Sequence, residues 1–291
     1  MPTSRYRESA APDYGHRFHA GNVGDVWKHC VLIEVLLRVA SSSTRVAYLD
    51  THAGEGRYAL GATGEWTEGI GRLWNRPNRT SDTAVAWYVE LCRRIGEGRE
   101  RPVRYPGSPM IARAVLGADA VLTLWERDAP TCDALQIVIG GDAHASIVRG
   151  DGLDAIAEAA VAAERDADVV VLIDPPYTQK ADWLAVPDAL ARAAAQTKRA
   201  CFLLWYPVKS LTRPNAMFAR LADAGVPGTL VELVTTPLDQ QRNRLNGSGV
   251  LLVRPPAGAI EAIAAAAPVV GATCATQSGR WSFRSQAWQG A

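Results

Sequence analysis

Short apolar runs that end abruptly in glycine, proline or acidic residues recur along the chain and alternate with stretches of helical spacing. Runs of this kind, rich in β-branched residues, are typical of strands buried on both faces of a parallel sheet. The pattern therefore predicts a single α/β domain. The expected strands span 45–50, 121–126, 146–149, 169–173, 200–205, 228–235 and 249–254.

The intervening segments predict helices, and the first of them has Asp25 as its expected N-cap. The tail after Gly271 carries three large aromatic residues and is expected to pack as a terminal strand or an extended segment. The expected helices span 25–39, 68–74, 83–95, 110–116, 130–138, 153–165, 182–196, 215–224 and 258–267.

The run 169–173 leads directly into Asp174, Pro175, Pro176 and Tyr177. Each proline lacks an N–H and fixes φ, so the strand stops there. A carboxylate, a proline carbonyl and an aromatic ring are left at the end of a central strand, where open α/β sheets bind ligands. A planar ring bearing an amine could stack on Tyr177 and donate to Asp174. The alternative is a plain strand end with a rigid turn.

Three further strand ends carry polar residues in an order that suggests a nucleotide cofactor. Asp50 closes the first strand and leads into the glycine-containing loop 51–56, which includes His52. This loop is not GxGxxG and lacks a Walker lysine, so it suits a cofactor without pyrophosphate. Glu126 ends the second strand, where an acid typically binds ribose hydroxyls. Asp151 and Gly152 follow the third strand and could reach an adenine or form a simple turn.

The four strand ends together predict the Rossmann-like fold of a class I S-adenosylmethionine-dependent methyltransferase. The Asp-Pro-Pro-Tyr sequence selects the branch that acts on the exocyclic amines of adenine or cytosine. A methyl sulfonium is already electrophilic, so no metal is expected, and catalysis is mainly a matter of alignment. Asp174 would accept the amine proton, and Tyr177 would stack on a flipped or single-stranded base.

Two segments lie outside this regular pattern. A helical subdomain at about 58–118 is expected as an insertion, because the second strand comes about three times later than a simple doubly wound fold requires. Residues 57–113 hold ten arginines against six acids, a local excess of +4 that suits phosphates or a solvated face. The segment 14–29 combines histidines with cationic and aromatic side chains, which suits an active-site lid or a structured cap.

Composition narrows the class of protein. The formal net charge is +1, so any nucleic-acid surface must be a local patch. Five scattered cysteines without a CxxC pair indicate buried free thiols in a reducing compartment. The N-terminus has no apolar signal region, and the chain has no run of 18 apolar residues. We therefore expect a cytoplasmic protein that does not bind membranes, and a monomer.

Several longer motifs closely resemble the RlmJ family of bacterial 23S ribosomal RNA adenine-N6 methyltransferases. Together they cover most of the chain from Tyr14 to about Pro256. Two differences are an N-terminal extension before Tyr14 and the sequence 125–128 around Glu126, where the acid itself is retained. The matching stretches are 18–22 with 25–29, 48–54 with 56–58, 63–65 with 68–70, 105–109, 173–177, 204–207 and 247–249.

The resemblance implies N6-methylation of one adenine in 23S ribosomal RNA, on protein-free or immature large-subunit RNA. It implies that Asp174 is also the catalytic acceptor, that Lys28 lies nearby and that Tyr14 meets the RNA. The residues implied to contact S-adenosylmethionine are His29, His52, Ser108, Glu126, Asp151, Gly152 and Asp174.

Two alternatives remain open from the sequence. A DNA adenine-N6 or cytosine-N4 methyltransferase would share Asp-Pro-Pro-Tyr, but no separate target-recognition domain is evident. A non-catalytic RNA-binding ribosome assembly factor would account for the arginine excess, but the intact residues 174–177 argue against lost turnover.

Overall fold

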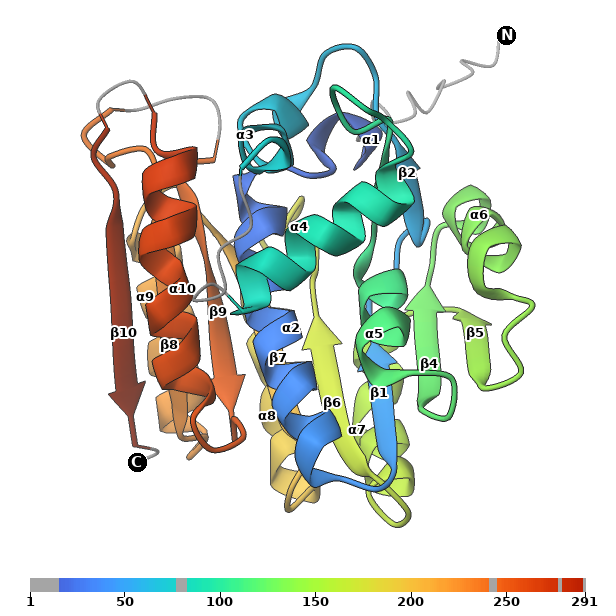
Figure 1. Cartoon of the computed structure of the whole chain (residues 1–291). Coiled ribbons are helices and arrows are strands. Elements are labelled where there is room, and N and C mark those ends of the chain that lie inside the picture. Colours follow the sequence, from blue (N-terminus) through green and yellow to red (C-terminus); the bar gives the residue numbers. More distant parts are fainter. Residues whose placement is uncertain (1–15, 77–82, 241–244, 277–278, 290–291) are drawn as a thin grey trace, which may run out of the picture.

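The computed structural model describes residues 16–76, 83–240, 245–276 and 279–289. Its main sheet has eight strands: β1 (Val46–Asp50), β4 (Val121–Glu126), β5 (Ala145–Arg149), β6 (Asp168–Ile173), β7 (Cys201–Val208), β8 (Gly228–Val234), β9 (Gly247–Val253) and β10 (Ser282–Trp288). Their order across the sheet is β10-β8-β9-β7-β6-β1-β4-β5 (Figure 1). The seven strands expected from the apolar runs all form, and the expected terminal strand is β10.

The sheet is parallel from β5 through β7, and β9 then runs antiparallel to both β7 and β8. In β6, Val169, Val171 and Ile173 pack into one hydrophobic cluster, whereas Val170 and Leu172 pack into the other. An unbroken apolar run is therefore required here, because successive side chains enter cores on opposite faces of the sheet.

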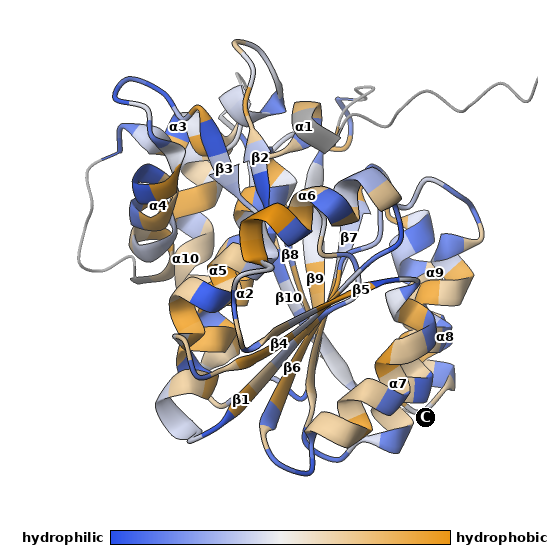
Figure 2. Ribbon diagram, turned by 90° about the vertical axis from the view of Figure 1, so that its right-hand side faces the viewer, coloured by the Kyte–Doolittle hydropathy of each residue, from blue (hydrophilic) through white to orange (hydrophobic). Residues whose placement is uncertain are grey.

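Helices cover both faces of this sheet, which gives three layers (Figures 1 and 2). One face carries α2 (Val23–Ser42), α4 (Thr83–Gly96), α5 (Ser108–Leu116) and α10 (Ala259–Cys274). The other face carries α7 (Gly152–Ala163), α8 (Asp182–Gln196) and α9 (Thr212–Asp223). The remaining helices are α1 (His16–His19), η1 (Glu65–Thr67), α3 (Ile70–Trp74) and α6 (Ala129–Ile139).

Helix α2 begins earlier than its apolar spacing suggested, and the prediction that Asp25 caps it is wrong. Asn22 is the N-cap, and its side-chain oxygen accepts from the Asp25 backbone N–H at 3.0 Å. Gly21, with φ of 77°, lets the chain turn into the helix. The Asp25 carboxylate is thus left for other partners, and it accepts from the Gly21 N–H and from Lys28.

The excursion between β1 and β4 contains a feature that the sequence did not reveal. Two three-residue strands, β2 (Arg57–Ala59) and β3 (Arg104–Pro106), pair antiparallel and enclose η1, α3 and α4. Helix α5 packs against α2 and β1, so it serves as the crossover helix between β1 and β4. The inserted segment therefore runs from β2 to β3. Its two ends are joined by a hydrogen bond from the Gly107 N–H to the Gly56 carbonyl, at 2.7 Å.

Two general properties follow from the structure. All five cysteines are buried free thiols, as predicted. None of the helices within the described ranges combines the length and hydropathy that crossing a bilayer requires.

Candidate active site

A cavity of about 730 Å³ opens at the carboxyl ends of the parallel strands. Its lining comes from strands β2, β3 and β7, from helices that include α1, α2 and α5, and from the loops that follow β1, β4, β5 and β6. Tyr14 lies outside the described residues, and Tyr177 is not among the described residues that line the cavity. The seven residues predicted to contact a cofactor all line it: His29, His52, Ser108, Glu126, Asp151, Gly152 and Asp174.

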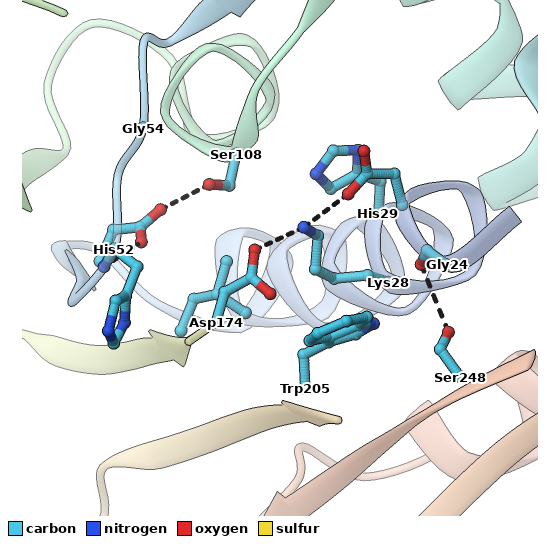
Figure 3. A network of polar contacts seen from close by, with 12 residues as sticks. Gly24, Lys28, His29, His52, Gly54, Ser108, Asp174, Trp205 and Ser248 are labelled. Carbon is cyan, nitrogen blue, oxygen red and sulfur yellow. Dashed lines mark hydrogen bonds and ion pairs between the residues drawn. The ribbon is translucent and has the colours of Figure 1, made fainter. Parts of the chain in front are cut away.

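Lys28 joins two carboxylates on one side of the cavity (Figure 3). Its Nζ lies 2.5 Å from Asp174 Oδ2 and 2.8 Å from Asp25 Oδ1. Burial alone would lower the pKa of Lys28, but the two carboxylates outweigh burial and hold that pKa above its ordinary value. The lysine is therefore charged at every physiological pH, and it fixes Asp174 from a rigid helix.

Asp50 forms a second polar centre beneath the cavity, and it was not among the predicted site residues. Its carboxylate is fully buried and accepts from Ser108 Oγ at 2.6 Å and from Tyr48 OH at 2.8 Å. The backbone N–H of His52 also donates to it, at 3.2 Å. Burial raises the pKa of Asp50 to about 6, although the hydrogen bonds from Ser108 and Tyr48 oppose that change. The sequence feature that could have identified Asp50 as a site residue is its position as an acid at the end of the first strand.

His29 is held in a chain of buried aromatic side chains. Its Nδ1 lies 2.7 Å from Tyr105 OH, which lies 2.8 Å from Tyr88 OH. Burial and the charge of Lys28 lower the pKa of His29 to about 3. His29 therefore faces the cavity as a neutral imidazole.

The loops after β4 and β5 place the remaining predicted residues. Glu126 accepts from the Gly54 N–H at 3.1 Å and from the Asp128 N–H at 2.8 Å, which ties the loop after β1 to the end of β4. Asp151 is the N-cap of α7 and accepts from the Leu153 N–H. A Cβ on Gly152 would lie 2.6 Å from the Thr51 backbone. Close packing against Thr51 therefore requires glycine at position 152, whether or not Gly152 also contacts a ligand.

Tyr177 does not line the cavity in the structure, whereas Trp205, which was not among the predicted site residues, does. Tyr177 has φ of 49°, which is uncommon for a bulky residue. Its ring packs 4.3 Å from that of Trp183, and its hydroxyl donates to the Trp205 carbonyl at 3.1 Å. Trp205 lines the cavity, with Lys28 Nζ 5.7 Å from its ring centroid. Trp205 is therefore an aromatic side chain of the cavity wall that sequence reasoning missed, although it ends a predicted strand.

Across the part of the chain that the structure describes, no group of three or more His, Cys, Asp or Glu side chains is arranged to hold a metal ion.

Comparison with known proteins places the chain in a family. The family model described as "Ribosomal RNA large subunit methyltransferase D, RlmJ" matches residues 43–288. The ribosomal RNA large subunit methyltransferase J of Escherichia coli K12 is 33% identical over 250 residues, 84% of this chain and 87% of that protein. The Haemophilus influenzae protein of the same name is 32% identical over 249 residues, which again cover 84% of this chain and 87% of the relative.

The fold is also found in a solved structure. A Legionella pneumophila protein superposes with a TM-score of 0.81 at 24% identity, covering 94% of this chain and 99% of that one. The predicted fold class, the Rossmann-like sheet of class I S-adenosylmethionine-dependent methyltransferases, is confirmed. The family match covers most of the chain, and both relatives exceed 30% identity over most of their length. The chain therefore belongs to the ribosomal RNA large subunit methyltransferase J (RlmJ) family.

Proposed function

We propose that the protein transfers a methyl group from S-adenosylmethionine to the exocyclic N6 amine of an adenine in 23S ribosomal RNA, on protein-free or immature large-subunit RNA. The observation that carries this proposal is the position of Asp174. The first residue of Asp-Pro-Pro-Tyr lines the same cavity as six other predicted cofactor residues and is held by Lys28. We therefore propose that the Asp174 carboxylate carries the reaction expected of a ribosomal RNA methyltransferase.

The residues of the cavity fit S-adenosylmethionine. The carboxylate of Glu126, at the end of the second parallel strand, suits the ribose hydroxyls. Ser108 and neutral His29 suit the amino-acid part, and Asp151 suits the adenine edge. Lys28 is already paired with two carboxylates, which fits a cofactor without phosphates. A volume of about 730 Å³ suits a ligand of nucleoside size together with a flipped base.

When bound, S-adenosylmethionine supplies a methyl group that is already activated by its positive sulfonium. The part of the protein is to align the amine and to remove its proton. We assign Asp174 and the Pro175 carbonyl as acceptors for the amine hydrogens, which draws the nitrogen lone pair out of conjugation with the ring. Asp174 then takes the proton, directly or through a water molecule. Lys28 holds Asp174 in position during both steps.

We propose that aromatic residues contact the RNA and its target base. Tyr14 is proposed to meet the RNA together with the rest of segment 14–29, whose described part includes α1 at the cavity wall. Tyr177 was predicted to stack on the base, and Trp205 is placed to share or replace that role. We expect the protein to act as a cytoplasmic monomer, with no metal in the reaction.

Transfer of a labelled methyl group to protein-free 23S RNA tests the reaction, with the methylated base identified by mass spectrometry. N6-methyladenine is expected, and duplex DNA is expected to remain unlabelled. Labelling of DNA alone would favour the DNA methyltransferase alternative. No labelling of any ribosomal RNA would refute the proposal.

The variant Asp174→Ala separates the reaction from RNA binding. It should abolish methyl transfer, because the acceptor is lost, while affinity for 23S RNA changes little. Tyr14→Ala should reduce RNA methylation more than affinity for S-adenosylhomocysteine. A wild-type protein that binds RNA without turnover would instead support the assembly-factor alternative.

A further inference from the structure

Three cationic side chains lie on the loops and helix end that follow β6 and β7. Lys180 lies between β6 and α8, Lys209 lies between β7 and α9, and Arg213 is in the first turn of α9. All three are exposed. These loops begin at the carboxyl ends of β6 and β7, which is the side of the sheet where the cavity lies. Thr178, two residues before Lys180, lines the cavity.

Contacts between rings connect this group to the Asp-Pro-Pro-Tyr loop. The Arg213 guanidinium lies 5.8 Å from the centre of the Trp183 ring. Trp183 in turn packs 4.3 Å from Tyr177, the last residue of the loop. The position of Arg213 is therefore coupled to the residues that carry the proposed reaction, although Arg213 itself does not line the cavity.

Lys209 is within electrostatic range of the N-terminal segment. Hydrogen bonding to Glu65 raises the pKa of His19, and burial and the positive charge of Lys209 both act in the opposite direction. His19 lines the cavity. The charge of Lys209 therefore acts on His19, a residue of the cavity wall.

Within the described ranges, the charges of this group are not paired with acidic side chains. No acidic side chain among the described residues forms an ion pair with Lys180, Lys209 or Arg213. Arg220, on the same helix as Arg213, does pair with Asp188. The three cations are therefore available to a partner of opposite charge.

Three arginines of the segment 57–113 are engaged in contacts within the protein. Arg72 donates to the Ala275 carbonyl, and Arg93 donates to the Trp74 and Arg76 carbonyls. Arg113 pairs with Asp142 at 2.6 Å. Arg72 thus ties the insertion to the C-terminal part of the chain, Arg93 holds α3 and α4 together within the insertion, and Arg113 fixes α5. The local excess of +4 therefore overstates the charge that the segment 57–113 offers to phosphates.

We propose that Lys180, Lys209 and Arg213 form a phosphate-binding surface that holds the RNA backbone beside the target adenine. The inference rests on the proposed function and adds to it the surface that positions the substrate. Lysine and arginine beside an aromatic group suit a single-stranded polyanion, whose phosphates they neutralise with release of counterions. Phosphate contacts of this kind fix register and orientation, while the cavity selects the base.

The test compares two triple variants that lose the same charge. The first is Lys180→Ala with Lys209→Ala and Arg213→Ala. The control is Arg45→Ala with Arg165→Ala and Arg192→Ala, three exposed arginines near the opposite edge of the sheet. Affinity for protein-free 23S RNA is measured over a range of salt concentrations with S-adenosylhomocysteine present. Calorimetric affinity for S-adenosylhomocysteine alone shows whether each variant is folded, and it should equal that of the wild type.

For the first variant, the slope of log affinity against log salt should become shallower by about 2, and affinity should fall about a hundredfold at 0.1 M salt. The control should keep the wild-type slope. Equal losses in both variants would overturn the proposal, because only total charge would then matter. Unchanged RNA binding in the first variant would also overturn it and would direct the search to an acidic protein partner.

Binding is measured without turnover, so the two proposals can fail separately. If the wild type binds RNA as expected but transfers no methyl group, the proposed reaction fails and the difference between the variants still supports the surface. If the wild type methylates RNA and the first variant does so with unchanged KM, the surface alone is refuted.

Discussion

Ser108 donates its hydroxyl hydrogen to the buried carboxylate of Asp50, with an Oγ–Oδ2 distance of 2.6 Å. An ionised carboxylate only accepts hydrogen bonds, so this hydrogen is committed. Ser108 Oγ can therefore offer only lone pairs to the cavity that it lines. Its partner there must be a donor, and in S-adenosylmethionine we expect that donor to be the α-ammonium group. We therefore expect Asp50 to act on the ligand through Ser108.

Asp50→Asn should weaken binding of S-adenosylhomocysteine by about tenfold, because an amide can donate to Ser108 and remove its fixed acceptor role. Ser108→Ala should weaken binding of S-adenosylhomocysteine by the same factor or by more. The control ligand is 5′-methylthioadenosine, which has no amino-acid part and should bind both variants as it binds the wild type. Calorimetry measures both ligands. Equal losses for both would show that Asp50 supports the whole cavity and has no specific effect on the ammonium position.

The same carboxylate should make stability depend on pH. Burial raises the pKa of Asp50 to about 6, above its ordinary value of 3.8. A raised native pKa means that the folded protein binds the proton more tightly than the unfolded chain. The contribution of protonated Asp50 to the free energy of unfolding is therefore complete below about pH 4. It is lost as the pH rises through 6, and it amounts to about 3 kcal/mol at most.

Urea unfolding of the wild type and of Asp50→Asn, at pH 4.5 and pH 7.5, isolates this contribution. The stability of the wild type relative to the variant should be greater at pH 4.5, by about 2 kcal/mol. His29, with its pKa lowered to about 3, acts in the opposite direction but is present in both proteins and cancels. A difference that is constant with pH would contradict the raised pKa.

Lys28→Met should destabilise the protein by about 3 kcal/mol or more, because two adjacent carboxylates then lose their shared cation. Methyl transfer should fall at least about a hundredfold, since Asp174 is no longer held in position. The double variant Lys28→Met with Asp25→Asn removes one of the unpaired charges. It should regain stability in urea unfolding without regaining turnover. Recovery of both would mean that Lys28 serves only the stability of the fold.

The central strands were predictable because each contains a continuous apolar run. In β6, Val170 and Val171 must enter different cores, so every position from Val169 to Ile173 is apolar and the run is conspicuous. β2 and β3 were not predictable, because strands of three residues are too short to show a period. The start of α2 was missed for a related reason. Asn22 and Asp25 are both good caps, and only the turn at Gly21 selects the first.

The candidate site was predictable at the strand ends, where a polar residue interrupts an apolar run. Asp174 and Glu126 were found in this way, and both line the cavity. What the sequence could not show is the direction of a side chain. The φ of 49° at Tyr177 turns its ring towards Trp183, and no pattern of residue types encodes that turn. The sharing of Lys28 between Asp25 and Asp174 likewise joins positions 146 residues apart.

Trp205→Ala should raise KM for 23S RNA more than Tyr177→Phe does. Trp205 lines the cavity, and loss of base stacking costs about 1–3 kcal/mol, or about 5- to 160-fold in affinity. Tyr177→Phe keeps the ring against Trp183 and loses mainly the hydrogen bond to the Trp205 carbonyl, so its main effect should be on stability. Trp205→Phe, which keeps an aromatic face, should restore most of the affinity for RNA. If Trp205→Ala leaves KM unchanged while Tyr177→Ala raises it, the base stacks on Tyr177 and the loop must turn when RNA binds.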